Sequence, residues 1–303
     1  MKKIAVLFAT LLLGLAMRAQ ETYVYALRDT VGLKLDIYRP TSPRADSACV
    51  LYLFGGGFAT GARGDAHAIK ICQMLADRGF VAVAMDYRLY FKHPARTSLL
   101  RAYMLFDTAI CWAVEDCADA IAFLCRGADS LHLNPKRMIL TGSSAGAITV
   151  LQTDYCRANQ LPLVDRLPKN FVPAAVVPFS GAVFCRNRAM RYATPPAPTC
   201  MFHGTDDRIV AYHRFRGSLG MSLFGSNYLA RVFEKNGYNY WILRYRDRGH
   251  EIASALPNLM DEFCTFVEAV LAGRVMQYDA VCHDASIKRT KWSDMSLLDL
   301  YRK

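Results

Sequence analysis

The sequence predicts a single α/β domain with a mostly parallel sheet, helices on both faces of that sheet, and an antiparallel hairpin at its N-terminal edge. Segments of strand character alternate with segments of helical periodicity along most of the chain, as they do where helices cross over between parallel strands. Several strand segments are apolar at nearly every position, as expected for strands covered on both faces. The first two flank a short turn segment, Asp29–Gly32, which predicts the hairpin.

The strand predictions rest on short apolar runs bounded by turn residues or glycines. The most regular run, Ala48–Phe54, is apolar throughout and leads directly into three consecutive glycines. In chain order, strands are predicted at Val24–Arg28, Lys34–Tyr38, Ala48–Phe54, Phe80–Met85, Arg137–Leu140, Phe171–Pro178, Thr199–Phe202 and Tyr240–Tyr245.

The helix predictions rest on apolar residues that recur every three or four positions, with glycines at the helix ends. Gly79 follows the first helix, and Gly127 closes the second. Helices are predicted at Ala66–Asp77, Ser98–Arg126, Ala147–Cys156, Tyr212–Gly220, Ser226–Asn236 and Glu251–Ala272.

The N-terminus predicts a signal peptide over residues 1–19. Lys2 and Lys3 precede an apolar run, Ile4–Leu15, and Ala19 supplies a small residue for cleavage. The run is shorter than the ~20 residues of a membrane span, which favours export to the periplasm or medium over stable membrane insertion. Residues 20–272 are then the folded domain, and residues 273–303 form a basic tail of unknown role.

Composition excludes several classes of partner and site. The net charge is +11, but the basic residues are scattered and carry no nucleic-acid motif, so we expect no nucleic-acid partner. Ten cysteines in an exported chain are compatible with one or two disulfides, whose pairing the spacing does not fix. No Cys-x-x-Cys pair or zinc-type spacing occurs, so no metal is expected.

A Gly-x-Ser-x-Gly pattern, Gly142–Gly146, marks a candidate nucleophile. The pattern is short, but here a predicted strand leads into it and a predicted helix leaves it, which is the context of a nucleophile turn. Ser144 is its central residue, exposed by the tight turn at the start of a helix. The backbone N–H of Ala145 follows the nucleophile and is a candidate oxyanion donor. Gly56 and Gly57, directly after a buried strand, are placed to supply the other donors.

A serine nucleophile needs a base and an acid that orients it. His250 follows the last predicted strand and comes last in the chain order nucleophile, acid, histidine. The acid is expected on the loop after the preceding strand, where Asp206 and Asp207 are adjacent and spacing does not choose between them. His203 precedes both, so a structural role in that turn is expected for it.

These motifs resemble those of the esterase/lipase group of α/β-hydrolases, close to its hormone-sensitive-lipase-like and carboxylesterase-like branches. The resemblance covers roughly residues 23–272. The family's His-Gly-Gly-Gly-Phe corresponds to Phe54–Phe58, its Asp-Tyr-Arg-Leu to Asp86–Leu89, and its Gly-Asp-Ser-Ala-Gly-Gly to Gly142–Ala147. The acid motif His-Gly-x-x-Asp-x-x-Val corresponds to His203–Val210, and so it selects Asp207.

The resemblance implies the α/β-hydrolase fold and a serine-dependent carboxylic ester hydrolase that needs no cofactor. In this hypothesis Ser144 attacks, His250 transfers the proton and Asp207 orients His250. The segment Lys34–Pro40 also resembles secreted bacterial esterases of plant polysaccharide, which suggests acetyl or feruloyl esters as substrates. Two alternatives remain: a serine peptidase on the same fold, and a non-catalytic binding protein, the latter motivated by Phe54 in place of the family's histidine.

Overall fold

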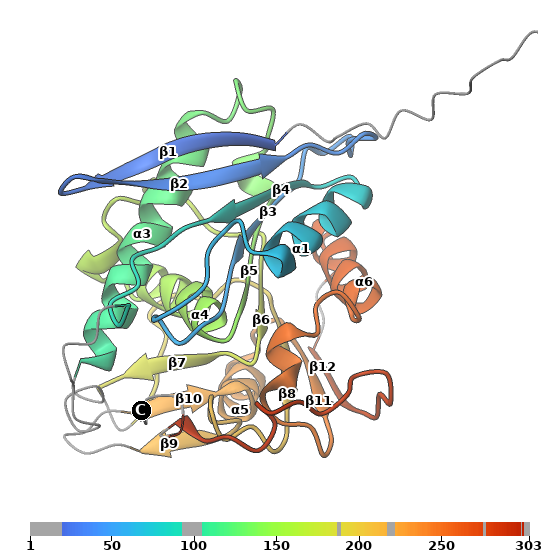
Figure 1. Ribbon diagram of the computed structural model, residues 1–303. Coiled ribbons are helices and arrows are strands. Elements are labelled where there is room, and N and C mark those ends of the chain that lie inside the picture. The colour runs from blue at the N-terminus through green and yellow to red at the C-terminus, as the bar shows by residue number, and fades with distance from the viewer. Residues whose placement is uncertain are drawn as a thin grey trace, which may run out of the picture.

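The computed structural model describes residues 20–92, 105–186, 189–216, 222–274, 277–297 and 299. Within them a nine-stranded sheet has the order β1-β2-β4-β3-β5-β6-β8-β11-β12. Strand β2 pairs antiparallel with both β1 and β4, and every other pairing in the sheet is parallel. Helices α1 and α6 lie on one side of the sheet and α3 and α4 on the other (Figure 1). The predicted fold class is confirmed.

The elements have the following bounds. The sheet contains β1 (Gln20–Arg28), β2 (Val31–Tyr38), β3 (Cys49–Leu53), β4 (Val81–Met85), β5 (Met138–Ser143), β6 (Ala175–Phe179), β8 (Thr199–Gly204), β11 (Tyr240–Tyr245) and β12 (Gln277–Cys282). The α-helices are α1 (Ala66–Asp77), α3 (Phe106–Arg126), α4 (Ala145–Ala158), α5 (Ser226–Asn236) and α6 (Met260–Leu271).

Burial explains the apolar strand sequences. Every residue of β3, β4, β5 and β6 is buried, because helices cover both faces of the sheet at its centre. Strand β1 forms one edge and shows mostly exposed or half-buried side chains instead. The pattern of apolar residues in each strand therefore indicates whether the strand lies at the covered centre of the sheet or at its edge.

The strand register gathers the predicted site at one edge of the sheet. Leu53 at the end of β3 is level with Gly142 of β5, and Phe179 at the end of β6 is level with Phe202 of β8. Parallel strands present their carboxyl ends at the same edge, so the loops that leave β3, β5, β8 and β11 converge there. These are the loops that carry the glycine run, the nucleophile, the acid and the histidine.

The predicted helix Tyr212–Gly220 is wrong over its described residues. The segment Tyr212–Gly220 contains β9 (Arg214–Arg216), which forms a small antiparallel sheet in the order β7-β10-β9 with β7 (Ala182–Cys185) and β10 (Ser222–Gly225). Stacking of the Arg214 guanidinium on Phe224, 4.7 Å from the ring centroid, stabilises this pairing, which local propensity does not reveal. Residues 217–221 lie outside the described part of the chain.

The predicted closing helix Glu251–Ala272 is two separate elements. A 3-10 turn covers His250–Ser254, and α6 begins only at Met260. Pro257 lies between them; it lacks a backbone N–H and cannot continue a helix from the preceding turn. The break leaves His250 on a short turn of its own.

The C-terminal region belongs to the sheet. Strand β12 lies beyond residue 272, pairs in parallel with β11 over six residues and extends the sheet by one strand. The remainder of the described tail packs on the loops at the carboxyl edge, as set out below. The predicted signal peptide, residues 1–19, and the first part of the predicted helix Ser98–Arg126 lie outside the described residues.

Within the described residues, no disulfide joins the cysteines, and most of them are buried as small apolar side chains. No described helix has the length and apolar character needed to cross a membrane.

A buried carboxylate ties the antiparallel edge to α3. Asp116 has a side-chain exposure of 0%. It accepts hydrogen bonds from Arg28 Nε at 3.2 Å, from the backbone N–H of Arg88 at 2.8 Å, and from Arg88 Nε at 2.9 Å. This cluster fixes the end of β1 and the segment after β4 against one helix.

Asp116→Asn is expected to destabilise the protein by about 1.5–3 kcal/mol, because it removes the buried carboxylate that Arg28 and Arg88 share, while each arginine keeps a second partner in Asp119 or Glu115. The free energy of unfolding in urea measures this. Asp261→Asn is the matched control: it removes an ion pair with Arg78 in which Asp261 is 82% exposed, and it should cost about 1 kcal/mol or less. Equal losses for both variants would contradict the role of the buried cluster.

Candidate active site

Ser144 occupies a strained turn between β5 and α4. Its φ is 52° and its ψ is −113°, a backbone conformation that residues other than glycine rarely adopt. Its backbone N–H donates to Phe179 O at 3.0 Å. The flanking glycines are required by close packing: a Cβ on Gly142 would lie 2.5 Å from the carbonyl carbon of Gly146, and one on Gly146 would lie 2.1 Å from Leu53 O. The sharp turn places Ser144 directly after β5. Ser144 is buried at 8% exposure and lines a cavity, so the turn does not expose it as the sequence predicts.

Three predicted residues form a continuous chain of hydrogen bonds. His250 Nε2 lies 2.8 Å from Ser144 Oγ, and His250 Nδ1 lies 2.8 Å from Asp207 Oδ2. Since a carboxylate only accepts, Nδ1 carries the proton and donates to Asp207, which leaves Nε2 to accept from Ser144. All three residues are buried. This is the geometry in which an imidazole takes a proton from a serine hydroxyl.

Asp207 is held ionised by its surroundings. Its Oδ1 accepts from the backbone N–H groups of Ile209 and Val210, each at 2.9 Å, and its Oδ2 lies 3.3 Å from His203 Nε2. Burial by itself would raise the pKa of Asp207. The electrostatic interaction with His250 and the hydrogen bonds from His203 and His250 outweigh burial and hold the pKa well below its usual range. The carboxylate is therefore ionised near neutral pH.

The neighbouring Asp206 is separated from this cluster. Its side chain is exposed and accepts from Thr205 Oγ1 at 3.0 Å. His203 is fully buried, accepts from Ser226 Oγ at Nδ1 and donates from Nε2 to Val210 O. It thereby shapes the acid loop and supports Asp207, which agrees with the structural role expected for it.

The loops that carry the acid and the base pack directly on one another. A Cβ on Gly204, at the end of β8, would lie 2.3 Å from the carbonyl oxygens of Arg248 and Gly249. The backbone N–H of Asp206 donates to Arg248 O at 2.9 Å. On the other side, Ser143 Oγ donates to Ala253 O at 2.6 Å and joins the nucleophile turn to the histidine turn. Backbone contacts thus set the relative positions of the three catalytic candidates.

The glycine run lies against the nucleophile. A Cβ on Gly55 would lie 3.2 Å from Ser144 Cβ, so the backbone approaches the serine closely. Gly56 and Gly57 have φ values of 120° and 62°, and Gly56 O accepts from Ala59 and Thr60 within the loop. Ala145 is the first residue of α4, where backbone N–H groups lack intrahelical acceptors. The roles of Gly56, Gly57 and Ala145 as oxyanion donors stay a prediction that this placement supports.

Phe54, which stands where the family motif has a histidine, is in contact with Tyr87. Tyr87 Oη donates to Phe54 O at 2.8 Å, and the two rings stack with centroids 4.5 Å apart. Both residues are buried. The loop is therefore anchored through its backbone carbonyl and a ring contact.

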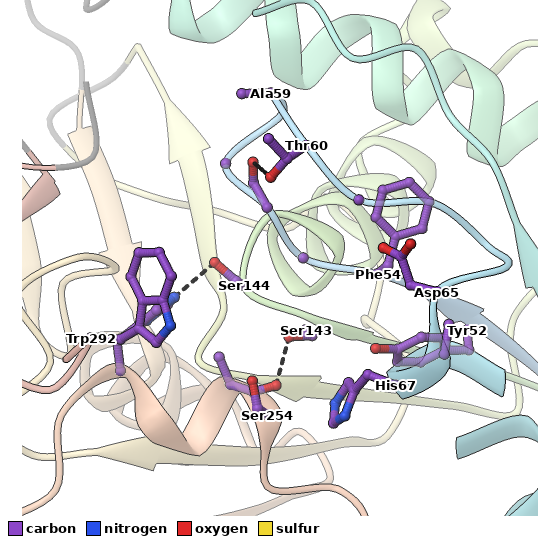
Figure 2. A pocket seen from close by; sticks show the side chains of 17 residues that line it. Tyr52, Phe54, Ala59, Thr60, Asp65, His67, Ser143, Ser144, Ser254 and Trp292 are labelled. Atoms are coloured by element: carbon purple, nitrogen blue, oxygen red, sulfur yellow. Dashed lines mark hydrogen bonds between the residues drawn. The ribbon is translucent and has the colours of Figure 1, made fainter. Parts of the chain in front are cut away.

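A cavity of about 630 Å³ opens beside Ser144. Ser144, His250 and Gly55–Gly57 line it together with aromatic and polar side chains from four regions of the chain (Figure 2). Among the lining residues that no sequence motif indicated are His67 and Trp292, the latter in the C-terminal tail. Within the described residues, no group of three or more His, Cys, Asp or Glu side chains could hold a metal.

Comparison with known proteins finds esterases and lipases among the proteins that this chain resembles. Residues 35–161 match the family model described as BD-FAE. Lipase 2 of Moraxella sp. (strain TA144) is 34% identical over 101 residues, which are 33% of this chain and 20% of that protein. Ethyl acetate hydrolase of Pseudomonas putida is 28% identical over 171 residues, which are 55% of this chain and 47% of that protein. The chain thus spans about half or less of the length of these curated relatives.

Solved structures share the fold over most of the chain. Esterase 2 of Thermogutta terrifontis with bound butyrate superposes with a TM-score of 0.59 at 21% identity, covering 84% of this chain and 95% of that one. The same esterase phosphoramylated by tabun also gives a TM-score of 0.59, covering 84% and 96% of the two chains. At this level of identity the likeness establishes the α/β-hydrolase fold.

Asp207→Asn is expected to lower kcat roughly 10⁴-fold with little change in folding, because an amide no longer fixes the tautomer that leaves His250 Nε2 free to accept. Steady-state kinetics with a chromogenic ester measures this. Asp206→Asn is the matched control, since it changes the exposed neighbour, and it should leave kcat near the wild-type value. Similar losses in both variants would contradict the assignment of Asp207.

Proposed function

We propose that this chain, a member of the α/β-hydrolase esterase family, hydrolyses carboxylic esters through an acyl-enzyme formed on Ser144. The observation that carries the proposal is the unbroken chain Ser144–His250–Asp207, with both links at 2.8 Å, beside a cavity that the glycine loop also lines. The esterase and lipase relatives point to the same class of reaction.

The proposed mechanism follows from the positions of these groups. Ser144 Oγ attacks the ester carbonyl carbon while His250 Nε2 takes the hydroxyl proton, and Asp207 stabilises the imidazolium that results. The N–H groups of Gly56, Gly57 and Ala145 stabilise the oxyanion of the tetrahedral intermediate. His250 then returns the proton to the leaving alcohol. In the second half of the reaction, a water molecule attacks the acyl-enzyme carbonyl while His250 takes its proton. His250 then returns this proton to Ser144 Oγ as the acid is released.

The substrates proposed are acetyl or feruloyl esters of plant polysaccharide, or small esters of related shape. The cavity of about 630 Å³ is large enough for an aromatic acyl group or a sugar unit. Its lining combines aromatic side chains with the polar side chains of Thr60, Asp65 and His67, which suits a substrate that has both flat apolar faces and hydroxyl groups. Polysaccharide substrates lie outside the cell, which agrees with the proposed export through residues 1–19.

Ser144→Ala is expected to reduce turnover of p-nitrophenyl esters by on the order of 10³ or more, because it removes the attacking atom and leaves the cavity otherwise unchanged. Wild-type and variant are compared over acyl lengths from acetate to decanoate, and the preferred length gives the depth of the acyl site. Ser130→Ala, a change at an exposed turn serine, is the control and should retain full activity.

A fluorophosphonate probe provides an independent test. It should label the wild-type protein at Ser144 and leave Ser144→Ala unlabelled, as read by peptide mass spectrometry. Labelling together with cleavage of a peptide anilide, but of no ester, would favour the serine peptidase alternative. Absence of labelling and of all turnover would favour the binding-protein alternative.

A further inference from the structure

The last described segment of the chain, residues 283–297, packs across the two loops that carry the acid and the base. It follows β12 and contacts the histidine loop first. Arg248 Nη2 donates to Asp284 O at 3.0 Å, and Arg289 Nη1 donates to Asp247 O at 2.9 Å. These contacts hold the segment against the residues directly before His250.

The segment then reaches the loop of Asp207. The backbone N–H of Leu297 donates to Arg208 O at 3.1 Å, and Arg208 forms a parallel bridge with Ser296. Between these two sets of contacts, Ser293 lies so close to the histidine loop that a Cβ on Gly249 would be 2.4 Å from Ser293 O. The segment therefore has a fixed position relative to the catalytic candidates.

A compact turn within this segment presents an aromatic ring to the cavity. The N–H of Thr290 donates to Ser293 Oγ at 2.8 Å, and the N–H of Ser293 donates back to Thr290 O at 2.9 Å. Ser293 is buried at 2% exposure, whereas Trp292 beside it is 40% exposed. Trp292 also donates its backbone N–H to Thr290 Oγ1 at 3.2 Å, and the Lys291 ammonium lies 4.8 Å from its ring centroid.

Trp292 lines the same cavity as Ser144, His250 and the glycine loop. Figure 2 shows its ring on one side of Ser144, with Tyr52, Asp65 and His67 on the other side. A large, partly exposed ring on a turn held by backbone hydrogen bonds offers a flat surface for stacking, and an aromatic side chain has few torsions to order on binding.

We propose that Trp292 is a specificity-determining residue, whose indole stacks on a flat ring of the ester substrate while the ester carbonyl lies at Ser144. The ring is either an aromatic acyl group or the pyranose ring of a sugar alcohol, since both present a flat apolar face. This inference rests on the proposed ester hydrolysis and deepens it, because it assigns a substrate-binding role to the C-terminal segment.

The test compares wild-type, Trp292→Ala and Trp292→Phe on three esters: methyl ferulate, with an aromatic acyl group; acetylated xylose, with a sugar alcohol; and ethyl acetate, with neither. Trp292→Ala should raise KM roughly 3- to 10-fold for methyl ferulate, for acetylated xylose, or for both. Its kcat should be nearly unchanged, because stacking stabilises the bound substrate and the transition state equally. The kinetics with ethyl acetate should be unaffected. Trp292→Phe should restore most of the affinity.

The ester whose KM rises in Trp292→Ala identifies the substrate ring that stacks on the Trp292 indole. A rise in KM for methyl ferulate assigns the stacking to the acyl group, and a rise for acetylated xylose assigns it to the alcohol. Trp112→Ala is the matched control: Trp112 is 36% exposed on α3, packs on Arg88 and does not line the cavity, so all three esters should be unaffected.

Two outcomes would overturn the proposal. Equal loss on all three esters would mean that Trp292 acts only by supporting the acid and base loops, and unchanged KM on all three would mean that it does not bind substrate. Binding of methyl ferulate and acetylated xylose to Ser144→Ala, with and without Trp292→Ala, is measured by calorimetry in parallel. If the wild-type protein turns over no ester, the proposed hydrolysis fails, and this binding comparison still decides the role of Trp292.

Discussion

Close packing of the Ser144 turn on β3 is the constraint on which the rest of the site depends. A φ of 52° at a serine costs of the order of 1–3 kcal/mol, and surrounding structure must hold it. Here the backbone of Gly146 lies against Leu53 O, and Gly55 lies against Ser144 itself. Because β3 and β5 are neighbours in the sheet, these two contacts together fix the nucleophile and the glycine run beside it.

A second set of backbone contacts completes the arrangement from the other side. Gly204 at the end of β8 lies against the loop after β11, so the acid and the base are positioned relative to each other without depending on side chains. The segment 283–297 packs across both loops. Catalytic candidates that are far apart in sequence are thus supported by contacts to the main chain at the carboxyl edge of the sheet, and their buried side chains complete the hydrogen-bonded chain.

The residues Asp86–Leu89 show how the glycine loop persists without its usual histidine. Asp86 accepts from the N–H of Arg63 at 3.1 Å, Tyr87 holds the carbonyl of Phe54, and Arg88 binds the buried Asp116. Asp86 and Arg88 therefore support different segments and do not pair with one another. Tyr87 connects this cluster to the glycine loop through the carbonyl of Phe54, and its ring stacks on the Phe54 ring.

The sequence by itself determined the fold class, the buried strands and the candidate residues Ser144 and His250. These features depend on local patterns: apolar periodicity, glycines at a tight turn, and the order of motifs along the chain. The choice of Asp207 over Asp206 came from a family pattern, and the structure gives the reason, since only Asp207 is turned inward to the hydrogen bonds of His203 and His250.

The tertiary structure alone decided the strands β9 and β12 and the place of Trp292. Strand β9 pairs with the nearby β10, and Arg214 packs on Phe224 across this pair. Strand β12 pairs with β11, which is distant in sequence because α6 lies between the two strands. Trp292 lies on a segment without periodicity, and it reaches the cavity only because that segment packs on the acid and base loops. Long-range packing, which no local pattern encodes, thus determined that Trp292 of the tail lines the cavity beside Ser144.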